Sequence, residues 1–545
     1  MIEFIAHNLA PIMFMALIVF LLLGYPVAIA IAANGLLFFA IAVELSPYSN
    51  DISLSWPLLQ TLPGRVLDVM RNDALLAIPF FTFMGIILER SGMAEDLLDT
   101  IGQLFGPVRG GLAYAVILVG ALLAATTGVV AASVMAMGLI SLPIMLRYGY
   151  DRPLAAGVIT ASGTLAQIVP PSLVLIVLAD QLGVSVGDMY AGAIIPSMIL
   201  VGVYCSYILF ISIVSPKSVP ALPLSARTLT GSFTSLLVVA SGAAALAIAS
   251  YLVLQQIPGQ GDGIWAACIG VLAAYAVAVA DKAGGFGLLS RLAQQVIIVL
   301  IPPLALIFLV LGTIFLGIAT PTEGGAMGAA GALLLGFAKR RLNFTLMSEA
   351  LDATTRLSCF VLFILIGSRI FSLTFYGING HIWVEELFLD LPGGVWGFLL
   401  VVNLLVFILG CFIDFFEIAF IVIPLIVPVA AKLGIDLVWF GVILGMNLQT
   451  SFLTPPFGFS LFYMRSVAPS GTYTDKVTGK QVAGISTTQI YRGAMVFIVL
   501  QIFMVGMIML FPQLSIPKAA AVIDTNSIHI EIPSLDTTAP PPSFD

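Results

Sequence analysis

The chain alternates between long apolar stretches and short polar segments, and this pattern predicts its secondary structure. Runs without a charged residue extend over 110–146, 228–261, 292–322, 437–464 and 493–517. About 20 apolar residues cross a bilayer as a helix, because backbone in hydrocarbon must satisfy its hydrogen bonds internally. We therefore expect an all-α polytopic membrane protein.

Charged and turn-forming residues divide these stretches into about twelve crossings. The expected spans are 8–23, 26–44, 74–90, 152–179, 189–214, 233–254, 263–280, 292–316, 319–338, 357–376, 436–464 and 492–513. Two further apolar segments, 110–146 and 395–430, begin and end beside polar turns and carry helix-breaking or polar residues in the middle. We interpret both as re-entrant hairpins.

Composition excludes several classes of protein. Of the 545 residues, 60% are hydrophobic and 9% are charged, whereas soluble domains carry about 25% charged residues. The formal net charge of −7 and the lack of a basic run argue against nucleic acid as a partner. All four cysteines lie within apolar segments, which suggests neither a disulfide framework nor a zinc site. The N-terminus has no basic segment or cleavage pattern, so it is interpreted as a retained first span.

Basic residues sort to one side of this layout, as the positive-inside rule requires. With the N-terminus outside, the outer side receives only Arg65, Arg71, Lys432 and Lys518, and Arg369 falls within a span. The other basic residues lie inside, and the tryptophans fall at outer ends of spans, as in an interfacial aromatic belt. Both termini are expected on the outer side.

The chain also repeats itself at an offset of 285 residues, since 392 − 107 = 285. Four of the five prolines between 104 and 172 meet prolines of the second half without a gap. At an average proline content of about 5%, chance would match far fewer. The matched pairs are Pro107 and Pro392, Pro143 and Pro428, Gly149 and Gly434, Asp151 and Asp436, Pro170 and Pro455, and Pro171 and Pro456.

The duplicated unit is a hairpin followed by a broken span, and the layout gives its two copies opposite topology. Inverted repeats with interrupted helices are typical of secondary transporters, whose binding site lies near the midplane between the repeats. Unwound backbone offers carbonyls to cations and half-helix N-termini to anions. Duplication of a purely structural bundle is the alternative, but prolines in mid-span would build such a bundle poorly.

The first unit carries hydroxyl groups beside glycines and beside a Pro-Pro break. Uncharged oxygen ligands suit a hard monovalent cation, so we expect a sodium site there. The alternative is that each hydroxyl only hydrogen-bonds to its own or a neighbouring helix. The candidate residues are Thr126, Thr127, Gly128, Ser162, Gly163, Thr164 and Pro170.

In the second unit, Asp414 is the strongest single candidate, because ionisable groups within a membrane are costly and usually functional. The alternative for Asp414 is a structural counter-ion of Arg369 in a neighbouring span. The other expected sodium ligands are Asn447, Thr450, Thr454 and Pro455.

Short motifs in both halves occur together in a specific order. They are 77–81 with Gly85, 149–151, 169–172, 319–323, 412–414, 434–436 and 453–458. In this combination they resemble the large membrane subunit of tripartite ATP-independent periplasmic (TRAP) transporters, over about 8–214 and 292–513. The chain departs from the family where Thr126-Thr127-Gly128-Val129 replaces a common Ser-Gly-Ser-Ser, and near Gln167, where a glycine is frequent.

The resemblance implies an elevator-type transporter of the bacterial inner membrane, with both termini in the periplasm and sodium as the coupling ion. It implies that the chain lies in membrane lipid and has two protein partners, a small four-helix membrane subunit (Q-type) and a periplasmic substrate-binding protein (P-type). The implied substrate is an organic acid, typically a carboxylate. Substrate contacts are expected near the two breaks, from Ser133, Gln167, Ser172, Gln449, Ser451 and Gly458.

The expected domain organisation follows the repeat. Scaffold spans cover 1–73, 215–291 and 292–356, with amphipathic arms at 93–108 and 342–356. The first repeat covers 74–214 and the second 357–465, followed by a cytoplasmic loop (466–491), a last span (492–513) and a flexible periplasmic tail (514–545). Two other functions compete: a stand-alone sodium–carboxylate symporter, and a membrane enzyme. The enzyme is disfavoured because all three histidines lie outside the spans.

Overall fold

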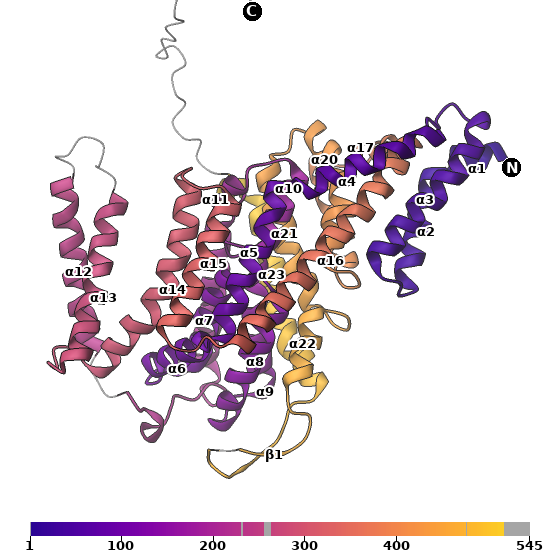
Figure 1. Ribbon diagram of the computed structural model, residues 1–545. Coiled ribbons are helices and arrows are strands. Elements are labelled where there is room, and N and C mark those ends of the chain that lie inside the picture. The colour runs from indigo at the N-terminus through magenta and orange to yellow at the C-terminus, as the bar shows by residue number, and fades with distance from the viewer. Residues whose placement is uncertain (1, 230–232, 255–262, 476, 517–545) are drawn as a thin grey trace, which may run out of the picture.

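The computed structural model describes residues 2–229, 233–254, 263–475 and 477–516, which are almost entirely helical (Figure 1). Its only strands among these residues, β1 (Tyr473–Thr474) and β2 (Gln481–Val482), pair antiparallel with Tyr473 opposite Val482. The prediction of a helical membrane protein is confirmed, since the described residues are mostly helical and nine of their helices are long and apolar enough to cross a membrane.

The N-terminal part supplies the helices at the right of Figure 1 and a bent pair that leads into the bundle. The pair formed by η2–α4 and α5 bends by 48° at residues 71–72. The bounds are α1 (Ile2–His7), α2 (Leu9–Leu22), α3 (Val27–Leu45), η1 (Ser46–Tyr48), η2 (Trp56–Thr61), α4 (Leu62–Met70), α5 (Asp73–Arg90) and α6 (Met93–Phe105).

The first repeat unit consists of a helical hairpin, a broken span and a long helix. Its elements are α7 (Gly111–Thr127), α8 (Val130–Arg147), α9 (Arg152–Thr164), η3 (Leu165–Gln167), α10 (Leu173–Leu182) and α11 (Val186–Val214).

The middle of the chain forms one helix pair beside the main bundle and three further long helices within the bundle (Figure 1). These are η4 (Leu224–Ala226), the pair α12 (Phe233–Leu254) and α13 (Gly263–Gly284), then α14 (Arg291–Phe315), α15 (Pro321–Ala338), α16 (Phe344–Gly377) and the short α17 (Gly380–Leu389). Helix α16 runs without interruption through residue 356, where the expected arm ends and the expected span begins.

The second unit repeats the hairpin and the broken span, and one more long helix follows. Its elements are α18 (Val395–Leu409), α19 (Phe415–Glu417), the π-helical η5 (Ile418–Val422), α20 (Ile423–Lys432), α21 (Leu437–Leu453) and α22 (Phe459–Val467); after β1 and β2 come α23 (Thr487–Leu510) and η6 (Pro512–Leu514).

Equivalent elements of the two units keep the 285-residue offset. Helix α8 begins at Val130 and the α19–α20 stretch at Phe415 (415 − 130 = 285), and they end at Arg147 and Lys432 (432 − 147 = 285). The second arms of the two hairpins are therefore equally long.

The broken spans begin in the same way. Asp151 caps α9 by accepting the N–H of Leu154 at 3.2 Å, and Asp436 caps α21 by accepting the N–H of Trp439 at 2.8 Å. A cis peptide bond lies in each break, at Pro170–Pro171 and at Pro455–Pro456. The matched sequence positions thus occupy matched places in the fold.

Nine helices of the described chain are long and apolar enough to cross a membrane, or ten if the bent pair counts as one span. The number differs from the expected twelve for physical reasons. The spans predicted at 152–179 and 436–464 are divided into shorter helices by their breaks, α2 is short, the glycine-rich α15 (predicted span 319–338) is not among the helices apolar enough to cross, and α5 counts only as part of the bent pair. Conversely, α8 and the stretch 415–432, which are arms of the hairpins, are long enough to cross.

Helices α9 and α23 approach each other at backbone distance. A Cβ atom on Gly157 would overlap the carbonyl oxygen of Gly493, and one on Gly493 would overlap that of Pro153. Small residues permit such close approach between membrane helices, where packing replaces the hydrophobic effect as the driving force. The last long helix is thereby fixed against the first broken span.

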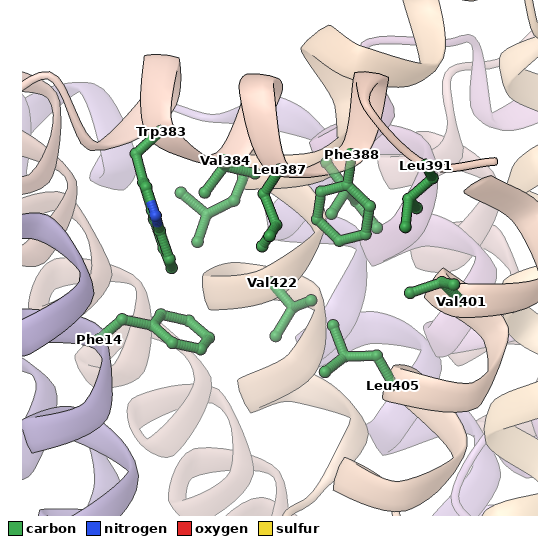
Figure 2. Close-up of a pocket in the computed structure, with 11 residues that line it drawn as sticks. Phe14, Trp383, Val384, Leu387, Phe388, Leu391, Val401, Leu405 and Val422 are labelled. Carbon is green, nitrogen blue, oxygen red and sulfur yellow. The ribbon is translucent and has the colours of Figure 1, made fainter. Parts of the chain in front are cut away.

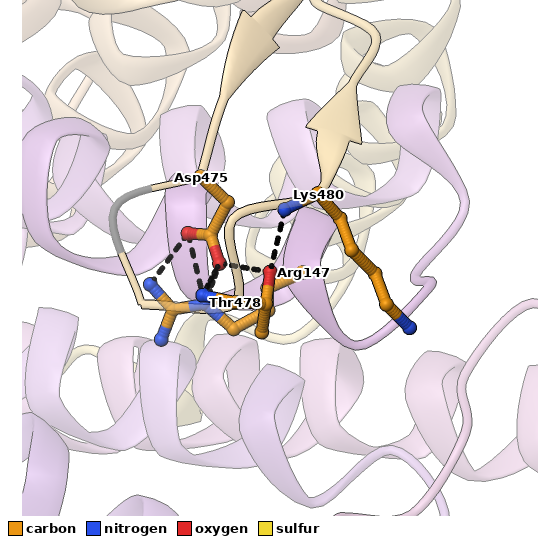
Figure 3. Close-up of polar contacts among 4 residues, drawn as sticks. All are labelled: Arg147, Asp475, Thr478 and Lys480. Atoms are coloured by element: carbon orange, nitrogen blue, oxygen red, sulfur yellow. Dashed lines mark hydrogen bonds and ion pairs between the residues drawn. The ribbon is translucent and has the colours of Figure 1, made fainter.

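At the end of the molecule opposite the N-terminus, the β1–β2 loop is bound to the end of α8 (Figure 1). Figure 3 shows the Arg147 guanidinium facing the Asp475 carboxylate, with Nη2 to Oδ1 at 2.8 Å and Nε to both oxygens at 3.0 Å. Thr478 donates its backbone N–H to the same carboxylate at 2.8 Å. The Arg147 guanidinium and the Thr478 hydroxyl hold the pKa of Asp475 well below its usual range.

Candidate functional site

The two broken spans meet at equivalent positions of the repeat. The Gln449 side-chain amide donates to the Thr164 hydroxyl at 3.3 Å, and 449 − 164 = 285. Both side chains are completely buried. Because Thr164 and Gln449 are equivalent residues, their contact marks the point where the two repeat units meet. The repeat predicts the binding site at this point.

The hydroxyls of the first broken span have their protons engaged by backbone. Ser162 donates to the Val158 carbonyl at 2.6 Å and Thr164 to the Ala161 carbonyl at 2.9 Å. Beyond the break, Ser172 donates to the Gln167 carbonyl at 2.7 Å. A hydroxyl that donates its only proton keeps its lone pairs. The oxygens can therefore still face a cation.

The turn of the first hairpin lies against the first break. Gly128 ends α7 with φ +60°, and a Cβ atom there would lie 3.0 Å from the Leu173 side chain, directly after the break. Thr126 is buried and donates to the Leu123 carbonyl at 3.0 Å. The side chain of Thr127 lies outside the described residues.

Helix α8 brings the other arm of this hairpin to the same place. Gly163 has no room for a Cβ atom because Val134 touches it, so α8 and α9 are in close contact. Ser133, the preceding residue on α8, is buried and has a polar partner. The structure thus places Ser133 on α8 directly before the point where α8 contacts α9.

Gln167 is the most unusual polar group of the first break. Its side chain is fully buried, yet neither its amide nitrogen nor its amide oxygen has a hydrogen-bond partner among the described residues. An unpaired buried amide costs roughly 1–3 kcal/mol per group. Such a cost in a well-packed segment points to a ligand or water that completes the bonding.

The second unit has the same arrangement with different side chains. Ser451 is buried against Gly410 of the hairpin, where a Cβ atom would overlap its hydroxyl. The Cys411 thiol lies 4.0 Å from the Ser451 carbonyl oxygen, and the rings of Phe412 and Phe457 lie 4.9 Å apart. The second hairpin turn therefore lies against the second break.

The remaining candidates of this span use their donors locally. Thr450 donates to the Met446 carbonyl at 3.0 Å, and Thr454 donates to the Thr450 carbonyl at 2.9 Å. Beyond Pro455, the N–H of Gly458 returns to the Thr454 carbonyl at 2.8 Å. Asn447 reaches across to α18, where its amide donates to the Asn403 carbonyl at 2.7 Å.

Asp414 lies at the N-terminus of α19. Its carboxylate accepts the N–H of Phe415 at 2.8 Å, and Glu417 accepts the N–H of Asp414 at 3.1 Å, which forms a capping box. Arg369 is exposed on α16, and no ion pair joins these two described residues. The structure therefore gives Asp414 backbone donors as partners instead of Arg369.

Sequence reasoning missed a second polar layer behind Gln449. The Tyr204 hydroxyl accepts from the Gln501 amide at 2.7 Å and from the Gln449 amide at 3.5 Å, and all three side chains are fully buried. The signal in the sequence was a phenol and an amide within the apolar stretches of α11 and α23. In the described part of the chain, no group of His, Cys, Asp and Glu side chains could hold a metal ion.

Known proteins resemble the chain over most of its length. A family model described as "Tripartite ATP-independent periplasmic transporter, DctM component" matches residues 14–514. The C4-dicarboxylate TRAP transporter large permease protein DctM of Pseudomonas aeruginosa is 28% identical over 75% of this chain and 81% of its own length. The sialic acid TRAP transporter large permease protein SiaM of Vibrio cholerae is 23% identical over 88% and 92%.

Among solved structures, the Alcanivorax borkumensis YdaH transporter aligns with a TM-score of 0.50 at 13% identity. The alignment covers 89% of this chain and 97% of that one. The likeness concerns the fold alone.

Proposed function

This chain belongs to the DctM component of the tripartite ATP-independent periplasmic transporters, and we propose that it carries an organic acid across the bacterial inner membrane, driven by the sodium gradient. It is a multi-pass transport protein, a large TRAP permease, and its relatives are permeases, not enzymes. Relatives named for C4-dicarboxylates, sialic acid and isethionate support an organic acid as the substrate class, and a carboxylate is the proposed choice within it.

The observation that carries this proposal is the contact of Thr164 with Gln449 between two hairpin turns and two Pro-Pro breaks. Broken helices present free carbonyls and N–H groups, and such backbone is stable in a membrane only where it lines a site. The unpaired amide of Gln167 adds a donor that fits a substrate carboxylate and an acceptor that fits a hydroxyl.

Sodium fits the oxygen atoms that these residues offer. In the first unit it would be held by oxygens of Thr126, Ser162, Thr164 and the backbone around Gly128, and in the second by Asn447, Thr450, Thr454 and Asp414. Bound sodium would supply positive charge beside the substrate carboxylate and so offset the cost of removing that carboxylate from water.

We further propose that both hairpins are re-entrant and that they move with the broken spans as an elevator against the scaffold of α14, α15 and α16. The turns that end mid-bundle against the breaks support this proposal. The orientation with both termini in the periplasm rests on the sorting of basic residues and on the position of the Arg147–Asp475 pair opposite the N-terminus.

The proposed partners are a small four-helix membrane subunit and a periplasmic substrate-binding protein. One relative, the isethionate TRAP transporter permease protein DctMQ, is longer than this chain, which spans 60% of it. A stand-alone sodium–carboxylate symporter is the competing function.

Uptake in proteoliposomes tests these proposals. Labelled C4-dicarboxylate and sialic acid are offered to vesicles that hold this chain and its small subunit, with and without the binding protein and with sodium or potassium outside. We expect uptake only with sodium and the binding protein. Uptake without the binding protein would favour the symporter, and equal uptake in potassium would exclude sodium coupling.

A further inference from the structure

Beneath α17, several parts of the chain line a partly open apolar cavity of about 250 Å³. Helix α17 contributes four side chains and Leu391 follows its end, and the others come from α2, α18 and the η5–α20 stretch. Figure 2 shows Trp383, Leu387 and Phe388 projecting from α17 toward Val422 and Leu405 on the opposite side. Apart from the indole nitrogen of Trp383, the lining side chains contain only carbon and hydrogen.

The chemistry of this lining selects a hydrocarbon occupant. A water molecule in a cavity needs two to four polar partners, and cavities lined by such side chains stay dry and accept apolar ligands. A protein helix is too large, because one turn about 5.4 Å long and 10 Å across fills roughly 400 Å³. Part of a single unbranched hydrocarbon chain, which is much narrower than a helix, fits the volume.

Polar groups lie near the cavity on the same two helices. Lys432, at the end of α20, forms an ion pair with Glu385 of α17, about 9 Å along the helix from the lining residue Ile426 at 1.5 Å per residue. The Trp383 indole N–H has no hydrogen bond within the described chain. Tryptophan at this level donates to lipid headgroups. An ion pair and an indole donor beside an apolar cavity match the amphipathic character of a phospholipid.

We propose that the cavity holds one acyl chain of a membrane phospholipid, with the headgroup beside Trp383 and Lys432. The acyl chain lies between α17 and α2 on one side and both arms of the second hairpin, α18 and α20, on the other. Binding follows from the cavity alone. An influence on transport rests on the proposed function, because the second hairpin carries Asp414.

The test compares a filled cavity with a matched surface change on the same helix. Val401 is partly buried and lines the cavity, whereas the adjacent Leu400 is 63% exposed and does not. Wild type, Val401→Phe and Leu400→Phe are reconstituted in vesicles of phosphatidylethanolamine and phosphatidylglycerol. The vesicles contain a trace of phosphatidylcholine with a diazirine on its acyl chain, and labelled peptides are mapped after irradiation.

Helix α12, whose window of residues 234–254 has no buried position, provides the reference for contact with bulk lipid. We expect wild type and Leu400→Phe to label α17 and α20 more strongly than α12. Val401→Phe should lower that ratio by about threefold or more, since the added ring occupies the cavity. Leu405→Phe, also in the lining, repeats the comparison if Val401→Phe does not fold.

Labelling of α17 and α20 no stronger than that of α12, or an unchanged ratio in a folded filled variant, would overturn the proposal. Protection of these peptides by a second copy of the chain or by the small subunit would also overturn it, because a protein would then be the occupant. Failed sodium-dependent uptake by the wild type would count against the proposed function and would leave the labelling result intact.

Discussion

Thr164 and Gln449 occupy the same position in the two repeat units, and their contact makes Thr164 the residue on which the sodium proposal can be tested. We expect Thr164→Val to raise the sodium concentration for half-maximal uptake roughly tenfold, as loss of a supporting ligand does. Thr160→Val is the control, because Thr160 is equally buried one turn away on α9 and donates to the Ala156 carbonyl. Equal sodium dependence of the two variants would return Thr164 to a structural role.

Asp414 allows a second test at this scale. Asparagine is as good an N-cap as aspartate, so Asp414→Asn should preserve the helix start while it removes the charge. We expect a stably inserted protein whose uptake is lost or no longer depends on sodium, and Asp436→Asn, another N-cap, should transport normally.

The alternative role of Asp414 makes the opposite prediction. Removal of one member of a buried ion pair would cost about 3–5 kcal/mol, a cost we do not expect here because Arg369 is exposed and forms no ion pair with Asp414 among the described residues. Poor folding of Asp414→Asn, with recovery of stability and uptake on addition of Arg369→Met, would identify a counter-ion pair.

Residue types and motifs predicted which hydroxyls gather at the breaks, because glycine, proline and hydroxyl residues lie close together in the chain. They could not predict Tyr204 and Gln501, since these reach Gln449 from helices far away in sequence. Nor could they show that Gln167 lacks partners, which depends on the packing around it.

Among the elements, the close approach of α9 and α23 gives a prediction about stability. Gly157→Leu should lower the free energy of unfolding by at least the 1–3 kcal/mol that is typical of overpacking, because backbone of α23 occupies the space. Gly506→Leu on α23 is the control, since no atom lies within 4 Å of its Cβ position. Thermal unfolding in detergent measures both, and equal melting temperatures would show that the helices can separate at no cost.

The loop that joins α22 to α23 gives a prediction about pH. Because the pKa of Asp475 is lowered in the folded state, its contribution to stability is complete above the unfolded pKa of about 3.9 and is lost as the pH falls through the folded value. Asp475→Asn should therefore melt at a lower temperature than wild type by a constant amount between pH 5 and 8. A difference that changes within this range would mean that another group titrates with the pair.

Hydropathy predicted most helices of the chain and the position of both hairpins. It did not predict α17 or the π-helical stretch 418–422 as separate elements. Hydropathy reports how apolar a segment is, whereas the direction of a short helix and a local change of helical pitch are set by neighbours in the bundle.

For the whole molecule, the elevator proposal requires that the broken spans move relative to the N-terminal scaffold. The Asn72 amide donates to the Asp180 carboxylate at 2.7 Å and so joins the start of α5 to α10. We expect a cross-link between cysteines at positions 72 and 180 to stop uptake, and reduction to restore it.

A bifunctional thiol cross-linker between cysteines at 96 and 339 provides the control, because the Lys339–Asp96 ion pair, at 2.8 Å, joins the arm to the scaffold. Their cross-link should leave uptake unchanged. Full transport with 72 and 180 joined would exclude motion of α10 against this part of the scaffold.

The equal spacing of the two units has a consequence for how the gene can vary. From the start of α8 to the second proline of the break, both copies contain the same number of residues, 171 − 130 = 456 − 415 = 41 steps along the chain. The additional helices α12 and α13 lie between the copies, and the β1–β2 loop follows the second one. A one-residue deletion within either copy would turn every later side chain of its helix by about 100° and remove the fit between the two halves. Length variation is therefore expected in the connections and not within the copies.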